Sequence, residues 1–320
     1  MKKVIFDTDI GIDDAMALLF LHYAPNVELK AIVSGFGNAD IDTTTRNALY
    51  MKEYFGIDAP VYRGAAAPIG KRLGDGYPDF VHGGNGLGDI EIDEPTLQAE
   101  VGTGAEAIVD LVKQNPQEIS IVAVGRLTNL ALALDLCPEL PKLVKEVIVM
   151  GGTFGHNGHH GNVSPVAEAN IAGDPHAADK VFTSGWPVTI VGLDVTQETI
   201  ADDRFFESLQ ANAGKAGDFI YRSSRFYLDF HEKITGAHAC PVHDSSAVAY
   251  LLDPYLYRTK MAAVRVATDG IAIGQTIAGD PDADFESDAW RGRPTCRICI
   301  GVEPEKVLAL YLATLASAGQ

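Results

Sequence analysis

The feature that most constrains the fold is a group of four aspartates between two apolar runs. Residues 4–6 are Val-Ile-Phe, as in a short buried strand, and residues 15–20 are apolar and are predicted to be a buried helix. The aspartates between them are Asp7, Asp9, Asp13 and Asp14. Helix capping uses one or two acids at a helix start, so it does not explain Asp7 and Asp9 on the strand side. The acids therefore indicate a site on a strand-to-helix turn.

The chemistry of this turn points to a bound cation. Asp13 and Asp14 open the predicted helix, where free N–H groups and the positive end of the dipole favour anions, and Gly11 lets the chain bend sharply. Four close carboxylates still repel one another, and this repulsion raises their pKa values unless a cation compensates. Ca²⁺ or Mg²⁺ is the simplest such cation, because both prefer oxygen ligands.

Composition restricts the class of protein. The chain has 320 residues, 47% of them hydrophobic, and no linker divides it, which predicts one large domain. A formal net charge of −18 disfavours a nucleic-acid partner, because such proteins need basic patches. No apolar run approaches the roughly 20 residues of a membrane span, and the amino-terminal residues lead directly into a strand rather than a signal peptide. We therefore expect a cytoplasmic protein without a membrane partner.

The order of predicted elements indicates the fold class. Strands alternate with helices at a spacing typical of α/β proteins, so we expect an open, doubly wound, mostly parallel sheet flanked by helices. The predicted strands are 4–6, 27–35, 61–62, 119–124, 146–150, 188–193, 261–266 and 295–302. The predicted helices are 15–20, 42–54, 105–115, 128–136, 175–183, 243–254 and 303–315, with several more in 202–230. Ligands of such sheets bind at the carboxyl ends of the strands, where Asp9, Asn38 and Met150 fall.

Two segments are predicted to cover this edge of the sheet. Residues 64–90 are rich in glycine, with eight glycines in residues 64–88, and we expect an irregular flap that can bring His82 to the site. Residues 202–254 are mainly helical and rich in aromatic side chains, most of which core packing explains. Tyr227 in this region is a candidate for contact with a flat ring.

The motifs carry a resemblance to a known family. Residues 7–15 match the D-x-D-x-G-x-D-D-A signature of the nucleoside hydrolases, which cleave ribonucleosides to base and ribose. Residues 125–131 resemble the family's G-x-L-T-N-x-A turn, and residues 150–170 resemble its M-G-G…N…A-E-x-N segment. Residues 243–249 resemble its H-D-P-x-A-V-A element, with Ser245 in place of the usual proline. The resemblance covers most of the chain.

This resemblance implies a set of site residues. One calcium ion per subunit would be held by Asp9, Asp14, Asp244 and the main-chain carbonyl of Val124, and Asp9 would deprotonate a calcium-bound water. The leaving base needs a proton or a hydrogen bond, and His243 is the best candidate acid for it, with His238, Tyr227 and His82 as further candidates; alternatively, His243 orients the neighbouring ligand Asp244. The substrate contacts would come from Asp13, Asn38, His82, Met150, Asn162, Glu168, Asn170 and Tyr227. We expect Glu168 and Asn170 to point the same way from a strand. The family also implies a homodimer or homotetramer.

Several alternatives remain open from the sequence. A Mg²⁺-dependent phosphohydrolase of the D-x-D type would use Asp7 as nucleophile, but Gly11 takes the place where that motif normally has Thr or Val. A non-catalytic calcium-dependent nucleoside-binding protein would need no base, yet Asp9 is present. Zinc is disfavoured: the histidines at 156, 159 and 160 suit a polar loop, and Cys296 and Cys299 lie in a strand-like run. The sequence leaves the choice between purine and pyrimidine undecided.

Overall fold

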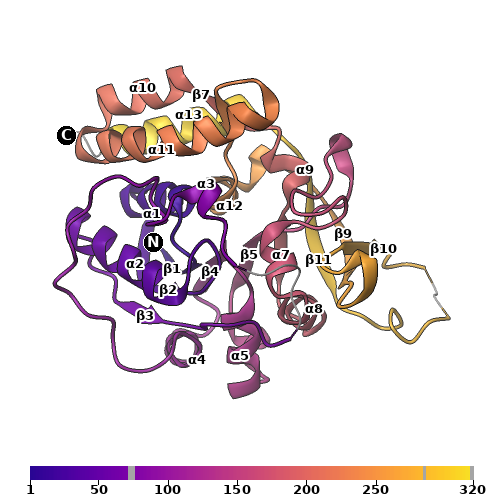
Figure 1. The fold of residues 1–320 in the computed structure, drawn as a ribbon. Helices are drawn as coiled ribbons and strands as arrows, with labels where there is room; N and C mark the ends of the chain where they lie inside the picture. The colour runs from indigo at the N-terminus through magenta and orange to yellow at the C-terminus, as the bar shows by residue number, and fades with distance from the viewer. Residues whose placement is uncertain (71–75, 284–285, 318–320) are drawn as a thin grey trace.

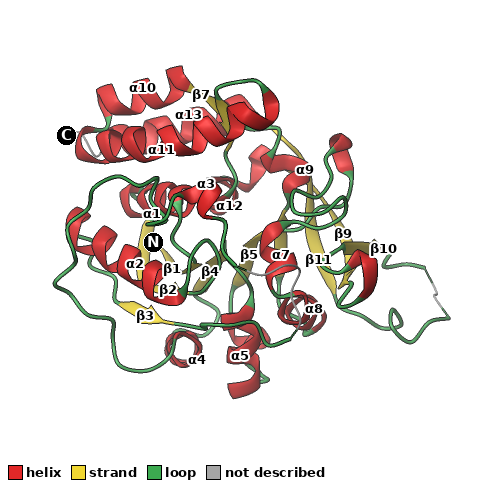
Figure 2. Ribbon diagram, in the orientation of Figure 1, coloured by secondary structure: helices red, strands yellow, loops and turns green. Residues whose placement is uncertain are grey.

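A nine-stranded sheet forms the centre of the computed structural model, which describes residues 1–70, 76–283 and 286–317 (Figures 1 and 2). In spatial order the strands are β10 (Thr276–Gly279), β9 (Tyr257–Val266), β11 (Thr295–Val302), β6 (Val188–Val191), β5 (Glu146–Met150), β4 (Ile119–Ala123), β1 (Lys2–Thr8), β2 (Val27–Ser34) and β3 (Val61–Arg63). Neighbours from β11 to β3 pair in parallel, whereas β9 is antiparallel to both β11 and β10. The predicted mostly parallel α/β fold is confirmed.

Helices cover both faces of this sheet (Figure 1). One face carries α1 (Ile12–Tyr23), α2 (Ile41–Phe55), α10 (Asp203–Asn212), α11 (Gly214–Thr235), α12 (Asp244–Leu252) and α13 (Pro304–Ala316). The other carries α4 (Gly104–Gln114), α5 (Thr128–Leu136), α6 (Leu140–Leu143) and α8 (Pro175–Thr183). Among the described residues, no helix is long and apolar enough to cross a membrane.

Strand β1 shows why the sheet is buried on both sides. Successive side chains of a strand point to opposite faces, so an apolar run supplies two cores at once. Val4 and Phe6 belong to the core under α1 and α11, and Ile5 belongs to the core under α4 and α5; all three are 0% exposed. The aspartates begin where this apolar run ends.

The strand order places a crevice at the carboxyl end of β1. The chain proceeds from β1 to β2 and β3 on one side, and later strands continue from β4 on the other side of β1. The direction of winding therefore reverses between β1 and β4, and ligands of open α/β sheets bind in the crevice outside such a switch point. Asp9 and Val124 follow directly on these two strands.

Some predicted elements differ in the structure. The glycine-rich segment contains a short helix, α3 (Asp79–His82), and its residues 71–75 lie outside the described residues. Glu168 and Asn170 do not lie on a strand: Glu168 precedes the helix α7 (Ala169–Gly173), because its side chain caps that helix by accepting from two backbone N–H groups. Edge strand β10 and the two-stranded sheet of β7 (Ile200–Asp202) and β8 (Ala239–Pro241) had no recognisable pattern. Cys296 and Cys299 are buried in β11 as free thiols, as expected for a strand.

Candidate active site

Asp14 anchors the acidic turn after β1. Its Oδ1 accepts hydrogen bonds from the Thr8 hydroxyl at 2.6 Å and from the Asp9 N–H at 3.1 Å. Its Oδ2 accepts from the Gly11 N–H at 2.9 Å and from the Asn38 side-chain amide at 2.7 Å. Four donors therefore fix this 0%-exposed carboxylate in the first turn of α1 and tie the loop after β2 to it.

Three carboxylates converge at this point. Oxygen atoms of Asp13, Asp14 and Asp244 lie within 4.8 Å of one another, although Asp244 opens α12, more than two hundred residues away in the chain. Burial, together with repulsion from Asp14, raises the pKa of Asp13 to about 8. Burial and repulsion from Asp13, Asp14 and Asp9 raise the pKa of Asp244 well above its ordinary value. An all-oxygen group of closely spaced, buried carboxylates is suited to a hard divalent cation.

Asp9 lies beside this group with one oxygen fixed and one without a partner. Its Oδ2 accepts from the Asn38 N–H at 2.8 Å, whereas its buried Oδ1 has no hydrogen-bond partner among the described residues. Backbone encloses it closely: a Cβ on Gly37 would come 1.7 Å from Oδ2, and a Cβ on Gly125 would come 2.5 Å from Oδ1. Burial and repulsion from Asp14 raise its pKa well above the ordinary value. The three carboxylates within 4.8 Å of one another therefore include Asp13 rather than the predicted ligand Asp9, which lies beside them.

Arg126 is a cation at this site that the sequence reasoning missed. Its positive charge acts against the upward pKa shifts of Asp9 and Glu168. The guanidinium lies 4.5 Å from the centre of the Phe36 ring and donates to the Gly37 carbonyl at 3.3 Å. The available signal was its position in the G-x-L-T-N turn directly after a buried strand. An arginine at the carboxyl end of such a strand lies close to the predicted aspartates and can offset their charge.

The segment around α7 brings Glu168 and Asn170 to the ends of β4 and β5, whereas Asn162 is exposed. Glu168 accepts from the backbone N–H groups of Gly152, Asn170 and Ile171, and burial raises its pKa. The Asn170 amide donates to the carbonyls of Val124 at 2.7 Å and Met150 at 3.2 Å. Asn162 is tied to the same helix, because its Oδ1 accepts from the Ala169 N–H at 3.0 Å.

A cluster of buried aromatic and imidazole rings faces the acids. His82, at the end of α3, accepts a hydrogen bond at Nδ1 from the Ile12 N–H at 3.3 Å and stacks on Tyr227 of α11 with ring centres 5.9 Å apart. His231, one helical turn further along α11, meets Tyr227 edge-on at 4.6 Å, and its buried Nε2 has no partner among the described residues. His231 was not predicted from the sequence.

Burial favours the neutral form of three histidines near the acids: His82, His231 and His243. Burial lowers the pKa of His82 to about 3, that of His231 to about 4 and that of His243 to about 3. Repulsion from His231 adds to the downward shifts of His82 and His243, and His82 adds to that of His243. A neutral imidazole donates one hydrogen bond and accepts one. His82 accepts at Nδ1, so its proton sits on Nε2.

His238 lies in a different cluster from these rings. Its Nδ1 pairs with Asp203 at 2.7 Å and its Nε2 with Asp229 at 3.3 Å, and its side chain is 29% exposed. Asp203 raises the pKa of His238 by hydrogen bonding to it. Both ring nitrogens are therefore engaged at the surface, which removes this residue from the candidates for a leaving-group acid.

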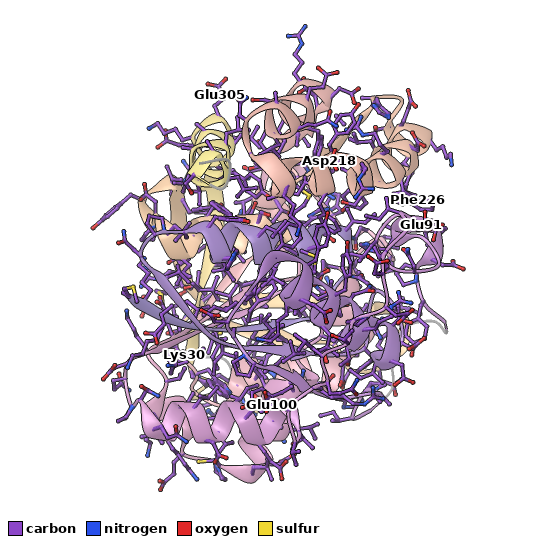
Figure 3. The ribbon with its side chains drawn as sticks, turned by 90° about the vertical axis from the view of Figure 1, so that its left-hand side faces the viewer. Lys30, Glu91, Glu100, Asp218, Phe226 and Glu305 are labelled. Carbon is purple, nitrogen blue, oxygen red and sulfur yellow. The ribbon has the colours of Figure 1, made fainter. Side chains whose placement is uncertain are left out.

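The glycine-rich segment packs against α11 beyond α3. A Cβ on Gly88 would come 2.5 Å from the Ser223 carbonyl and 3.2 Å from Phe226, so only glycine fits this approach. Figure 3 shows Phe226 near Glu91, the residue that follows this segment. Arg46 and Asn47 of α2 donate to the Asn85 carbonyl from the other side.

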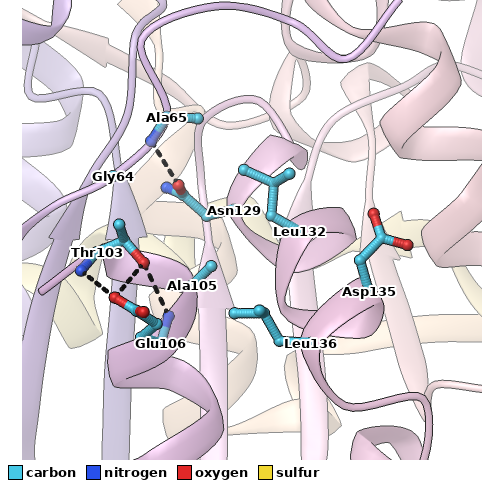
Figure 4. A pocket seen from close by; sticks show the side chains of 9 residues that line it. All are labelled: Gly64, Ala65, Thr103, Ala105, Glu106, Asn129, Leu132, Asp135 and Leu136. Carbon is cyan, nitrogen blue, oxygen red and sulfur yellow. Dashed lines mark hydrogen bonds between the residues drawn. The ribbon is translucent and has the colours of Figure 1, made fainter.

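A separate cavity of about 350 Å³ lies behind the site, between α4 and α5 (Figure 4). Asn129 lines it and connects it to β1, because its amide donates to Asp7 at 2.7 Å while its Oδ1 accepts from the Ala65 N–H. Burial raises the pKa of Asp7 to about 7. The carboxylates of the acidic group do not line this cavity, so it is not the crevice at the switch point.

The loop histidines do not form a metal group in the described part of the chain, where the two groups with suitable spacing are Asp13–Asp14–Asp244 and Asp229–Glu232–His238. His159 pairs with Glu198 at 2.5 Å. The backbone N–H of His156 donates to Asp194, a buried acid that holds this loop. These contacts agree with the expected polar loop.

The fold and the acidic group define an α/β enzyme with a metal-site geometry at the sheet's switch point, and comparison with known proteins identifies the class. The family model described as "Inosine-uridine preferring nucleoside hydrolase" matches residues 4–309. The chain belongs to this nucleoside hydrolase family, whose members are metal-dependent.

Named relatives and solved structures agree over nearly the whole chain. Uridine nucleosidase 1 of Arabidopsis thaliana is 38% identical over 98% of this chain and 93% of its own length. The inosine-uridine preferring nucleoside hydrolase of Leishmania major is 35% identical over 86% of this chain and 87% of its own. A plant nucleoside hydrolase structure superposes with a TM-score of 0.94 at 36% identity, covering 98% of this chain and 99% of that one. The purine-preferring ribonucleoside hydrolase of Gardnerella vaginalis gives 0.91 at 32% identity, with 99% of each chain covered.

Proposed function

We propose that this protein hydrolyses the N-glycosidic bond of ribonucleosides, purine or pyrimidine, to free base and ribose, with calcium as its metal. The observation that carries the proposal is the buried oxygen-only group of Asp13, Asp14 and Asp244 with Asp9 beside it. The names of the relatives, which include uridine nucleosidases and inosine-uridine hydrolases, support both classes of base. The comparisons favour neither the phosphohydrolase nor the non-catalytic binding protein.

The residues present fit a calcium ion. Asp14 and Asp244, whose oxygen atoms lie within 4.8 Å of each other and of an Asp13 oxygen, would hold it together with Asp9 and the Val124 carbonyl. The Val124 oxygen accepts from Asn170, and a carbonyl has a second lone pair for a ligand. When bound, calcium supplies positive charge that lowers the pKa of a neighbouring water and keeps that water close to the sugar.

Asp9 is the base that accepts the proton of the attacking water. Its Oδ2 is fixed by the Asn38 N–H, and its Oδ1 has no partner among the described residues, so Oδ1 is the atom free to take the proton. Cleavage passes through a cationic, oxocarbenium-like sugar, and the surrounding carboxylates stabilise that charge where it develops.

The sugar contacts are proposed for the polar residues around α7 and the acidic turn. Asp13 has a buried Oδ1 that makes no hydrogen bond within the described residues and lies 3.9 Å from His82 Nδ1, which suits a ribose hydroxyl. Glu168 is held rigidly by three backbone donors, so its oxygens are preorganised acceptors. The remaining proposed contacts are Asn38, Met150, Asn162 and Asn170.

The base is proposed to sit among His82, Tyr227 and His243. Their rings are buried, and a neutral imidazole can donate a hydrogen bond to a leaving base as negative charge develops on it. His243 is the proposed leaving-group acid, because it adjoins the acidic group through Asp244. The glycine-rich segment and the helices of 202–254 would cover this pocket.

The decisive experiment is a panel of nucleosides and nucleotides, incubated with and without a calcium chelator and assayed for free base and free phosphate. We expect base release from nucleosides that stops on chelation and returns with calcium. Phosphate release without base release would support the phosphohydrolase, and tight binding without turnover would support the binding protein. Light scattering of the same preparation tests the expected homodimer or homotetramer.

A further inference from the structure

Thr196 makes a contact with His243 that no sequence motif indicated. It ends the short helix α9 (Leu193–Thr196) and is 0% exposed. Its Oγ1 lies 2.8 Å from Nδ1 of His243. Within the described part of the chain, Nδ1 is the ring nitrogen of His243 that has a hydrogen-bond partner, and Nε2 has none.

The direction of this hydrogen bond follows from asking which buried hydrogen would lack an acceptor in each case. The Thr196 hydroxyl carries one hydrogen, and His243 Nδ1 is its partner in the described structure. If Nδ1–H donated instead, the hydroxyl hydrogen of the 0%-exposed Thr196 would be buried without an acceptor, which costs about 1–3 kcal/mol. A proton on Nε2 carries no such cost, because Nε2 is not among the fully buried atoms that lack a partner in the described structure, and it can donate to solvent or to a bound base. The hydroxyl therefore donates to Nδ1, and a neutral imidazole then carries its proton on Nε2.

The backbone around this pair fixes both partners. The Val242 N–H donates to the Thr199 carbonyl at 2.8 Å, and β7 pairs with β8 through Ile200 opposite Pro241. Backbone hydrogen bonds thus join the segment just before His243 to the segment just after Thr196. The ring has a fixed place, so the hydroxyl decides which of its nitrogens is protonated.

We propose that Thr196 is a positioning residue that holds His243 in the tautomer with its proton on Nε2, directed at the leaving base. The inference rests on the proposed role of His243 in base departure. In this tautomer Nε2–H donates a hydrogen bond that strengthens as negative charge develops on the base. In the other tautomer Nε2 presents a lone pair to the same atom and repels it.

Three threonine variants separate the hydroxyl from the packing. Thr196→Val keeps the shape and removes the donor, and Thr196→Ser keeps the donor. Thr199→Val is the matched control, because Thr199 is equally buried, three residues away, and its hydroxyl has no partner among the described residues. We expect kcat for inosine to fall about ten- to a hundredfold in Thr196→Val with little change in KM, to stay within about threefold in Thr196→Ser, and within about twofold in the control. Uridine should lose less, because its base depends less on a donor.

Nitrogen-15 NMR of histidine-labelled protein reads the tautomer directly, with His243 assigned by comparison with His243→Ala. We expect the wild type to show a protonated Nε2 and unprotonated Nδ1, and Thr196→Val to show a mixture. A protonated Nδ1 in the wild type overturns the proposal even if Thr196→Val fails to fold. Unchanged inosine turnover and an unchanged tautomer in Thr196→Val would overturn it as well.

The proposed role of His243 can fail separately. If His243→Ala releases base from inosine at the wild-type rate, His243 is not the donor to the leaving base, whatever its tautomer. If His243→Ala is slow while Thr196→Val and the control are equally fast, the role of His243 stands and the inference about Thr196 is wrong.

Discussion

Replacing Asp244 by asparagine should have opposite effects on stability without and with calcium. Asp244 shares a buried group with Asp13 and Asp14, with oxygen atoms within 4.8 Å. At an effective dielectric constant of about 20, two unit charges at that distance repel by about 3 kcal/mol. Protonation already relieves part of this repulsion, since the pKa values of Asp13 and Asp244 are raised.

The net change follows from these opposing contributions. Asparagine keeps the shape and removes one charge, and it forfeits about 0.5 kcal/mol of favourable interaction with the amino terminus of α12. We therefore expect Asp244→Asn to raise the free energy of unfolding of the metal-free protein by about 1–2 kcal/mol. At about 2 °C per kcal/mol for a chain of this size, Tm should rise by about 2–4 °C in chelator. With excess calcium the variant becomes the less stable protein. Calcium binding raises the free energy of unfolding by RT ln(1 + [Ca²⁺]/Kd), and this gain is smaller for the variant because its Kd is larger.

The assay is thermal unfolding at pH 7.5 in chelator and in millimolar calcium. Asp229→Asn is the matched control: it removes an acid from the exposed Asp229–Glu232–His238 group, where solvent screens repulsion, and should change the unfolding free energy by less than about 0.5 kcal/mol in either buffer. A destabilised Asp244→Asn protein in chelator, or a calcium-induced Tm shift equal to that of the wild type, would refute the reasoning.

Four further outcomes are expected. Asp9→Asn should lower kcat by at least about 10² while nucleoside affinity stays within about tenfold, because the amide can still accept from the Asn38 N–H but cannot take a proton; intact turnover would exclude Asp9 as the base. The metal-free protein should lose stability as pH rises from about 4 to 8, since the folded state keeps protons on Asp7 and Asp13, with pKa values of about 7 and 8, that the unfolded chain has released. Calcium affinity, measured by titration calorimetry, should increase over the upper part of that range, because the ligands must be deprotonated; a flat profile would contradict the ligand set. Ribose should be released with inverted configuration, as seen by NMR immediately after turnover, and trapping a sugar covalently on Asp9 or Asp13 would disprove direct attack by water.

The alternation of strands and helices could be predicted because it depends on residues close together in the sequence. Side-chain period and turn residues act over a few positions, so β1, the acidic turn and α1 were evident from residues 4–20 alone. The elements that were missed, such as β10 and α7, are short or depend on partners elsewhere. α7 begins directly after Glu168 because the buried carboxylate of that residue caps it, whereas the spacing of Glu168 and Asn170 had indicated a strand.

The site was only partly visible in the sequence for the same reason. The carboxylates stood out because four acids beside an apolar strand have no ordinary structural explanation, and their positions at strand ends placed them at one edge of the sheet. That Asp244 meets Asp13 and Asp14, that Arg126 offsets the charge of Asp9 and that Thr196 faces His243 were decided by tertiary packing. A lone arginine, threonine or histidine has many satisfactory environments, and only the folded chain selects one by burying its polar atoms against a particular partner.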